Sequence, residues 1–326
     1  MTGGRQRARR RSGPDRSAAV ADAYEDLRPL LFSIAYRMLS SVSEAEDLVQ
    51  EAFIRYQNAL ADGSVVESPR SYLSAVVTRL AIDQLRSARV RRETYVGEWL
   101  PEPLVSDPGS EDPAVITERA ESLSMSFLLL LERLSPVERA VFLLHDVFDY
   151  GFDEIAAIVG RTPATCRQHA VRARRHIEAN RPRFDASPAE RDELVTQFFA
   201  AANAGDVDGL IEMLAEDVIL YGDGGGKVPQ WAGPIAGADR VARMFTGGAT
   251  VMRGAGLTYE PALVNGQAGA ILRAPEGAVV GVLSIELSDG RIRTIRSVVN
   301  PDKIGHVGRV RDLGSILRRP APEGAG

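Results

Sequence analysis

The stretch that decides how this chain folds is FDEIAAIVGRTPATCRQHAVRARRHIE, residues 152–178. Two isoleucines three residues apart share one face of a short helix, and Gly160 ends it because glycine tolerates the left-handed conformation of a helix C-cap. Thr162 supplies an N-cap hydroxyl, and Pro163 fixes φ at the first position of the next helix. The sequence therefore predicts two helices joined by a tight corner.

The second of these helices has an apolar face and a basic face. The residues of the apolar face are spaced by four, three and four positions and are Cys166, Ala170, Ala173 and Ile177. Arginine can bond guanine and glutamine can bond adenine through paired donors and acceptors, and further arginines can meet phosphates. The side chains expected to contact DNA are Thr165, Arg167, Gln168, Arg172, Arg174 and Arg175. A basic helix is often a plain solvated surface, but the agreement of caps, turn and packing face favours a DNA-reading helix-turn-helix.

Length and charge divide the chain into several modules. With 326 residues, of which 44% are hydrophobic, the chain exceeds one ordinary domain and can fill two or three cores. The net charge is −5, yet residues 1–96 carry 15 basic and 12 acidic side chains, and residues 151–183 carry 7 and 3. Residues 97–150 carry 3 basic and 11 acidic side chains. Two basic modules therefore flank an acidic segment.

Cysteine content and hydropathy bear on the cellular compartment. A single cysteine, Cys166, excludes an internal disulfide and fits a reducing cytoplasm. The longest aliphatic run, residues 127–131, cannot span a bilayer, and the basic N-terminus is followed by no apolar segment. The four histidines have no metal-ligand spacing. We therefore expect a cytoplasmic protein without membrane contact, metal or cofactor.

The first folded domain is expected over residues 21–96, after a basic tail over residues 1–20 that is expected to be disordered. Its helices are predicted over residues 24–39, 44–60 and 68–93. Ser43 and Glu46 have the spacing of a capping box for the second helix, and Ser68 with Pro69 opens the third. The third helix ends in cations available to DNA phosphates, which are Arg79, Arg86, Arg89, Arg91 and Arg92.

A linker rich in proline and acidic residues is expected over residues 97–114, followed by a second helical domain over residues 115–183. Ser135, Pro136 and Glu138 predict the start of a helix over residues 136–146. A longer helix over residues 115–134 precedes it, and the helix-turn-helix follows.

Beyond Pro188 the periodicity changes from helical to alternating. Helices are predicted over residues 189–204, 207–214 and 238–245. Apolar and polar residues alternate over residues 283–288, and Asn265-Gly266 and Asp289-Gly290 are hairpin turns. We expect a separate α+β domain over residues 188–310 and a flexible tail over residues 311–326.

Four segments together resemble extracytoplasmic-function (ECF) sigma factors of bacterial RNA polymerase. They are DLVQEAFIR (47–55), LAIDQLRSARVRR (80–92), LSPVERAVFLL (134–144) and DEIAAIVG (153–160). The resemblance implies two all-α sigma domains, region 2 and region 4, which bind promoter DNA at the −10 and −35 elements. It also implies core RNA polymerase, through its β and β′ subunits, as the partner. The contact with the β′ clamp helices would involve Asp47, Gln50, Glu51 and Phe53.

Three positions depart from the pattern of that family. Tyr72 stands where the family often has tryptophan, Arg79 where it often has asparagine, and Arg161 where the turn is commonly apolar. The promoter sequence therefore stays open.

The remainder resembles the SnoaL-like, cone-shaped α+β domain found at the C-terminus of SigJ-type sigma factors. Three segments carry this resemblance: WLPEP (99–103), DGGGK (223–227) and NPDK (300–303). A tryptophan is an unusual anchor for a linker, whereas DGGGK could also be a plain turn. The regulatory contact implied between linker and domain comprises Trp99, Leu100, Pro101, Asp223, Gly224, Gly225, Gly226, Lys227, Asn300, Pro301, Asp302 and Lys303.

Two functions compete at this point. The first is a promoter-specificity subunit, not an enzyme, whose activity is modulated by its own third domain. The alternative is a small-molecule-sensing or catalytic SnoaL-like domain fused to a DNA-binding module, with Tyr221, Asp223 and Lys227 lining its pocket. An unidentified small molecule is accordingly a further candidate partner of the third domain.

Overall fold

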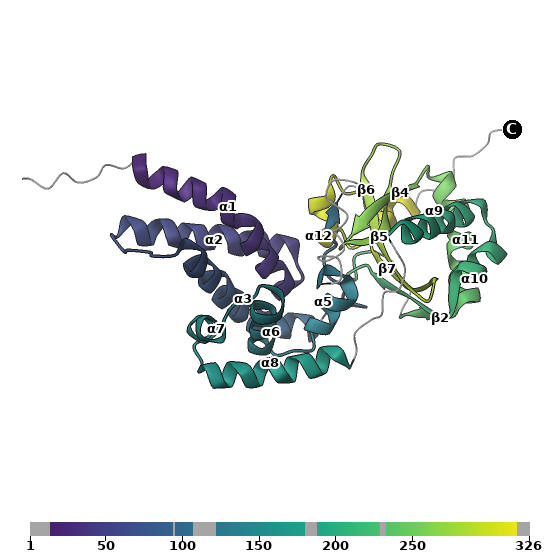
Figure 1. The fold of residues 1–326 in the computed structure, drawn as a ribbon. Helices are drawn as coiled ribbons and strands as arrows, with labels where there is room; N and C mark the ends of the chain where they lie inside the picture. Colours follow the sequence, from purple (N-terminus) through teal and green to yellow (C-terminus); the bar gives the residue numbers. More distant parts are fainter. Residues whose placement is uncertain (1–13, 94, 107–121, 180–187, 229–232, 318–326) are drawn as a thin grey trace, which may run out of the picture.

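The structure, a computed structural model, describes residues 14–93, 95–106, 122–179, 188–228 and 233–317. Figure 1 shows a helical body and a second body built around a curved sheet. Helix α5 (Met125–Leu131) lies between the two bodies.

Three helices form the first part of the helical body: α1 (Pro14–Leu39), α2 (Val42–Ala61) and α3 (Pro69–Glu93). Helix α1 begins ten residues before the expected start at Tyr24, so residues 14–20 are helical and not a disordered tail. Ser68 opens α3 as expected, since its hydroxyl accepts a hydrogen bond of 3.2 Å from the backbone nitrogen of Ser71.

The capping box predicted for α2 is wrong. The N-cap is Ser41, whose hydroxyl accepts a hydrogen bond of 3.1 Å from the backbone nitrogen of Glu44. The hydroxyl of Ser43 instead contacts the carboxylate of Glu102, at 3.1 and 3.2 Å from its two oxygens. The distant carboxylate of Glu102 thus engages the hydroxyl that was expected to cap the helix, and the helix begins earlier, with Ser41 as its N-cap.

The second part of the helical body contains the predicted helix-turn-helix. Helix α6 (Pro136–Phe142) begins with the expected capping box of Ser135 and Glu138 and continues into a π-helical turn, η1 (Leu143–Val147). Helix α7 (Phe152–Val159) ends at Gly160, which has the left-handed φ of 66°, and Thr162 caps α8 (Pro163–Glu178). The helix expected over residues 115–134 falls partly outside the described residues, and within them Ser124 caps the short α5.

The two helical parts share one hydrophobic core, in which Leu31 and Leu73 pack together with Leu128, Ile155 and Cys166. A buried guanidinium also joins them. Arg139 of α6 is 1% exposed and donates hydrogen bonds to the carbonyl oxygens of Leu131, at 2.8 Å, and of Met38 at the end of α1. Its Nη2 atom lies 2.8 Å from Oε1 of Glu132. A buried charge needs such a complete set of partners, so the two parts are held in one relative position.

The sheet has seven strands in the order β1-β4-β5-β6-β7-β2-β3. The strands are β1 (Val105–Ser106), β2 (Leu214–Asp223), β3 (Ile235–Ala236), β4 (Thr258–Val264), β5 (Gln267–Arg273), β6 (Val279–Ser288) and β7 (Arg291–Val298). Strand β2 runs parallel to β7, and the other neighbours are antiparallel. The edge strand β1 comes from the predicted linker, where Val105 pairs with Val264 of β4. The linker is therefore part of the sheet.

Helices α9 (Pro188–Ala204), α10 (Val207–Met213) and α11 (Ala238–Gly254) pack on the inner face of the sheet. Both predicted hairpin turns are confirmed: Asn265-Gly266 joins β4 to β5 and Asp289-Gly290 joins β6 to β7, with positive φ at all four residues. The described part of the chain ends with the short helices α12 (Pro301–Ile304) and α13 (Leu313–Leu317). Ile316 of α13 is 6% exposed, so residues 311–317 belong to the domain and not to a flexible tail.

The expected polar face of β6 is not exposed to solvent. Ser284 is 0% and Glu286 is 5% exposed, as buried as the apolar residues between them. The reason lies on the outer face of the sheet, where Leu100 of the linker and Met125 of α5 pack against Val282 and Val298. Both faces of this sheet are therefore covered.

Phe53 of α2 is a core residue and not the surface contact that the sequence implied. It is 6% exposed, and its ring centroid lies 4.8 Å from that of Tyr24 in α1. The neighbouring Ile54 points outward and is 53% exposed.

We predict that Phe53→Ala lowers the free energy of unfolding by about 3–5 kcal/mol, because it removes a buried aromatic side chain and leaves a cavity. Ile54→Ala is the matched control and should change that free energy by less than about 0.5 kcal/mol. Chemical denaturation followed by circular dichroism measures both. Equal losses in the two variants would contradict the burial of Phe53.

Candidate functional site

Helix α2 presents a polar stripe with one apolar member. Asp47 and Gln50 are exposed and Glu51 is half-buried, with its Oε1 atom 2.7 Å from Nε of Arg55. Ile54 lies one turn beyond Gln50 on the same face. Sequence reasoning missed Ile54, although its spacing of seven residues from Asp47 was the available signal. This stripe is a surface that a protein partner can cover.

Helix α8 presents its basic face to solvent, as the sequence predicts, but several of its cations are engaged within the helical body. Arg172 Nε lies 2.9 Å from Oε1 of Glu138, and Arg174 Nε lies 2.6 Å from Oδ1 of Asp146. The guanidinium of Arg167 lies 5.8 Å from the centre of the Phe152 ring. Gln168 and Arg175 are exposed, and Thr165 is half-buried at the start of the helix.

Val171 lies at the centre of this basic face and is 45% exposed. An exposed aliphatic side chain among arginines is suited to contact a thymine methyl group in a major groove. Sequence reasoning placed only polar residues on this face, although Val171 follows Gln168 by three residues. Val171 therefore joins the candidate DNA contacts.

Arg79 of α3 binds α7 of the helix-turn-helix. Its Nε atom donates to the carbonyl oxygen of Ile158 and its Nη2 atom to that of Ala157, both at 2.8 Å. These carbonyls belong to the last turn of α7, which carries the negative end of the helix dipole. Arg86 lies farther along α3 and pairs with Asp83 at 3.0 Å. The side chains of Arg89, Arg91 and Arg92 lie outside the described residues, so the structure does not place them.

The linker is fixed to the third domain by a buried ion pair. Asp223 ends strand β2 with 0% exposure, and its Oδ2 atom lies 2.7 Å from Nζ of Lys303 in α12. The same carboxylate oxygen accepts a hydrogen bond of 2.9 Å from the backbone nitrogen of Leu100, and Lys303 donates one of 2.6 Å to the Leu100 carbonyl oxygen. The linker backbone thus completes the coordination of both charges.

Two aromatic rings, that of Tyr95 just before the linker and that of Trp99 within it, enclose the ammonium group of Lys303. Its Nζ atom lies 4.4 Å from the centre of the Trp99 ring and 4.7 Å from that of Tyr95. The Tyr95 hydroxyl donates to Oδ1 of Asp223 at 2.5 Å and accepts from Nδ2 of Asn300 at 2.9 Å. Burial and the adjacent Asp223 carboxylate raise the pKa of Tyr95. We call Tyr95, Trp99, Leu100, Asp223, Asn300 and Lys303 the linker anchor.

The other residues named from these motifs have separate places. Lys227 is exposed and forms an ion pair of 2.5 Å with Asp302 at the surface, outside the linker anchor. Gly225 and Gly226 have φ of 60° and 70°, and a side chain at Gly226 would meet Val96 of the linker at 3.0 Å. Gly226 therefore lets the loop approach Val96 closely, and the absence of a side chain at Gly225 leaves room for Asn300. Three more residues adjoin the anchor: Pro101 is buried, Gly224 opens the turn and Pro301 begins α12.

Glu102 connects the linker to the start of α2. Its carboxylate accepts hydrogen bonds from the backbone nitrogens of Val42, at 2.8 Å, and Ser43, at 3.1 Å, and from the Ser41 hydroxyl, at 2.8 Å. A carboxylate at a helix N-terminus satisfies free N–H groups and opposes the helix dipole. Sequence reasoning missed Glu102 because its partners lie some sixty residues earlier in the chain.

Asn265 joins three segments at the tip of the β4–β5 hairpin. Its Oδ1 atom accepts from the backbone nitrogen of Leu104 in the linker at 3.0 Å. Its Nδ2 atom donates to the Tyr36 hydroxyl in α1 at 2.6 Å and to the Leu123 carbonyl oxygen before α5 at 3.0 Å. The third domain therefore holds both helical parts and the linker through one side chain.

The three residues of the alternative catalytic hypothesis each have a different partner. Asp223 is bound by the linker, Lys227 pairs at the surface, and Tyr221 packs beneath the Arg296 guanidinium at 5.7 Å. Within the described part of the chain, no three histidine, cysteine or acidic side chains are placed to hold a metal ion. Across the same residues, no helix is both long enough and apolar enough to cross a membrane.

Comparison with known proteins gives matches to three family models in the order of the domains. They are Sigma-70 region 2 over residues 23–91, Sigma-70 region 4 over residues 124–177 and a SnoaL-like domain over residues 195–304. The chain is 38% identical to the ECF RNA polymerase sigma factor SigJ of Mycobacterium tuberculosis strain H37Rv, over 93% of this chain and 97% of that protein. The chain belongs to the family of ECF RNA polymerase sigma factors.

Further relatives agree with this membership. A probable ECF sigma factor, SigI of M. tuberculosis, is 32% identical over 87% of this chain and 94% of its own. The crystal structure of M. tuberculosis SigJ is 35% identical and superimposes with a TM-score of 0.69, covering 87% of this chain and 98% of that one. In this ECF sigma factor α1–α3 therefore correspond to region 2, α5–α8 to region 4, and α9–α12 with β2–β7 to the SnoaL-like domain.

Glu138 links the start of α6 to α8 of region 4. Burial raises the pKa of its carboxyl, but the Ser135 hydroxyl, the Ser135 backbone nitrogen and the Arg172 guanidinium outweigh that effect and lower the pKa to about 2. A depressed folded-state pKa stabilises the fold above the unfolded value near 4.5, and this stability is lost as the pH falls toward 2.

We predict that Glu138→Gln is less stable than the wild type at pH 7, and that the difference shrinks as the pH falls from about 4.5 toward 2, because the wild-type carboxyl then also becomes neutral. Urea unfolding midpoints measured between pH 7 and pH 3 give this difference directly. Glu178→Gln, an exposed change at the end of α8, is the control and should show a much smaller difference. A difference for Glu138→Gln that stays constant with pH would contradict the assignment.

Proposed function

We propose that this ECF sigma factor binds core RNA polymerase through α2, with the β and β′ subunits as partners, and directs transcription initiation at promoter DNA in the cytoplasm. The exposed stripe of Asp47, Gln50, Glu51 and Ile54 supports the polymerase contact. The basic outer face of α8 supports reading of the −35 element, and the basic end of α3 supports contact with the −10 element.

We predict that Asp47→Lys combined with Glu51→Lys weakens binding to core polymerase at least about tenfold, because charge reversal on a complementary surface introduces repulsion. Binding of the labelled full chain to core polymerase measures the effect. Glu212→Lys, an exposed change on α10, is the control and should bind like the wild type. Unchanged affinity of the double variant, with its circular dichroism spectrum preserved, would rule out α2 as the docking surface.

The described conformation is, in this proposal, a closed form that cannot read a promoter. Arg79 carries this conclusion, because the guanidinium expected to meet a DNA phosphate is bound to two carbonyls of α7. One turn of duplex DNA spans about 34 Å, so two modules in side-chain contact cannot read elements that lie a turn or more apart. Region 4 must therefore leave region 2 before both elements are engaged.

The SnoaL-like domain, in this proposal, controls that separation. It binds the linker through the linker anchor, region 2 through Asn265, and region 4 through Glu286, which accepts from Ser126 of α5. The linker itself adds a contact to region 2 through Glu102. A linker fixed at both ends limits the distance that its two modules can reach. We infer that the domain acts through its contacts with the linker and with regions 2 and 4, because Asp223 is bound by the linker backbone and Lys227 pairs with Asp302 at the surface.

We predict that Trp99→Ala, and separately truncation after Arg183, open the closed form and alter polymerase-dependent transcription. Trp99→Ala removes one ring from around Lys303, and the truncation removes Asp223 and Lys303 altogether. Energy transfer between dyes on α2 and α8 should report a longer distance in the Trp99→Ala variant, and run-off transcription should change in rate or promoter range.

Val251→Ala, an exposed change on α11, serves as the control for this experiment. If the folded Trp99→Ala protein kept the wild-type distance, and both variants transcribed the same promoters at the wild-type rate, the regulatory role of the linker anchor would be excluded.

A further inference from the structure

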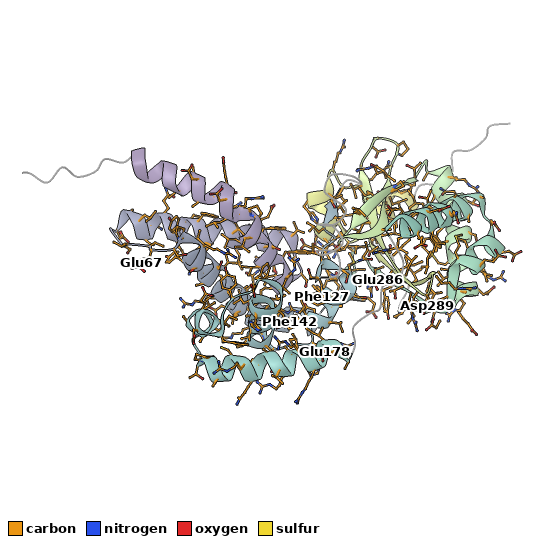
Figure 2. The ribbon with its side chains drawn as sticks, in the orientation of Figure 1. Glu67, Phe127, Phe142, Glu178, Glu286 and Asp289 are labelled. Atoms are coloured by element: carbon orange, nitrogen blue, oxygen red, sulfur yellow. The ribbon has the colours of Figure 1, made fainter. Side chains whose placement is uncertain are left out.

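A second buried polar cluster lies on the outer face of the sheet and shares no residue with the linker anchor. It consists of Gln267 on β5, Ser284 and Glu286 on β6, Arg296 on β7, and Ser126 of α5, and we call it the polar seam. The exposed fractions of its four sheet residues are 1%, 0%, 5% and 6%. Figure 2 labels Glu286 at the junction of the sheet and the helical body, beside Phe127 of α5.

Part of the polar seam is an ordinary interdomain contact. The carboxylate of Glu286 accepts hydrogen bonds from the backbone nitrogen of Ser126, at 3.1 Å, and from its hydroxyl, at 2.6 Å. Arg296 donates from Nη2 to the Ser126 hydroxyl at 2.8 Å, and its Nη1 atom lies 2.8 Å from Oε1 of Glu286. Region 4 is therefore attached to the third domain through Ser126.

The rest of the seam consists of buried polar groups without a hydrogen-bond partner. Among the residues that the structure describes, Nε of Arg296, Oγ of Ser284 and Nε2 of Gln267 make no hydrogen bond. The contact of Arg296 Nη1 with Glu286 is close enough for an ion pair but lacks hydrogen-bond alignment. Guanidinium and amide nitrogens can only donate, and a buried donor that lacks an acceptor pays a desolvation penalty. The seam is thus short of acceptor oxygens.

Strand register brings these donors to one place. Ser284 pairs directly with Arg296, so their Cβ atoms stand about 4.5–5.5 Å apart. Gly269 pairs with Ser284 on the other side, and Gln267, two residues before it, points to the same face. Arg191 of α9 donates to Oε1 of Gln267 at 3.3 Å. The amide nitrogen of Gln267 has no hydrogen-bond acceptor among the described residues. All the unpaired donors therefore lie on the face that α5 covers.

We propose that the polar seam binds a small molecule through a carboxylate or phosphate group. An anionic oxygen group accepts several N–H and O–H bonds at once and pairs well with a guanidinium fork. Glu286 is already engaged by Ser126 and Arg296, while Arg191 adds a second positive charge beside Gln267. A metal cation is disfavoured because the unpaired nitrogens of Arg296 and Gln267 can only donate. Such a ligand would strengthen the attachment of α5 to the third domain.

The test uses the full chain and needs no polymerase, so its outcome is independent of the proposed function. Thermal unfolding and calorimetric titration are performed with sodium acetate and with sodium phosphate, each compared with sodium chloride at equal ionic strength. We expect a saturable rise of the unfolding midpoint with acetate if the ligand group is a carboxylate, and with phosphate if it is a phosphoryl group.

Single donor deletions identify the site. Ser284→Ala and Gln267→Leu should each weaken the apparent anion affinity about tenfold, the factor that corresponds to about 1.4 kcal/mol. Ser284→Ala removes a hydroxyl that has no hydrogen-bond partner among the described residues, so the fold should tolerate it. Arg293→Met, on the same strand but with its side chain 52% exposed, is the matched control and should keep the wild-type affinity.

Arg296→Met should abolish the midpoint shift, and the two single donor deletions keep the test valid if that variant does not fold. Equal midpoints in acetate, phosphate and chloride would show that the donors are satisfied by water only and would overturn the proposal. An anion effect that persists unchanged in Ser284→Ala and Gln267→Leu would overturn it as well, because the anion would then bind elsewhere.

Discussion

The ion pair between Asp223 and Lys303 is the constraint on which the arrangement of this sigma factor depends. A buried pair gains little net stability, because the loss of hydration offsets most of the Coulomb attraction. It does demand complete coordination, and the backbone of Leu100 supplies the missing donor and acceptor. The pair therefore specifies where the linker must lie. Loss of either partner would leave an uncompensated charge in the interior.

The position of the linker then determines the contacts of the helical body. Two residues beyond Leu100, Glu102 reaches the N-terminus of α2, and three residues farther Val105 adds a strand to the sheet. On the same outer face, Glu286 binds the backbone of α5 in region 4. Both carboxylates satisfy N–H groups at the start of a sigma helix, so the third domain and its linker hold regions 2 and 4 by the same physical means.

Direct packing of region 2 on region 4 completes the closed form. Arg139 is buried between them, and Arg79 donates hydrogen bonds to the carbonyl oxygens at the end of α7. Arg139 of region 4 donates to a carbonyl oxygen of region 2, and Arg79 of region 2 donates to carbonyl oxygens of region 4. Each region therefore has one guanidinium that is bound by the other region. A DNA phosphate and a helix C-terminus offer the same kind of negative oxygen. In the proposed closed form, Arg79, a proposed DNA contact, is therefore bound by a partner that is chemically equivalent to a phosphate.

Local patterns in the sequence determined the secondary structure and the family of this protein. The caps at Thr162 and Ser135, the left-handed Gly160 and both hairpin turns depend on residues within a few positions of one another, so short-range stereochemistry is enough to predict them. The sigma motifs can likewise be recognised from the sequence alone, because they follow one another along the chain in the order of the family.

Only the tertiary structure decided which polar residues are buried and which partner each one meets. Ser43 failed as a cap because Glu102 took its hydroxyl, Phe53 turned into the core, and Glu286 was buried beneath α5 although its strand alternates like a solvent-exposed one. These outcomes depend on partners tens to more than a hundred residues away. Helical and strand periodicity describes one face of one element and carries no information about what will cover it.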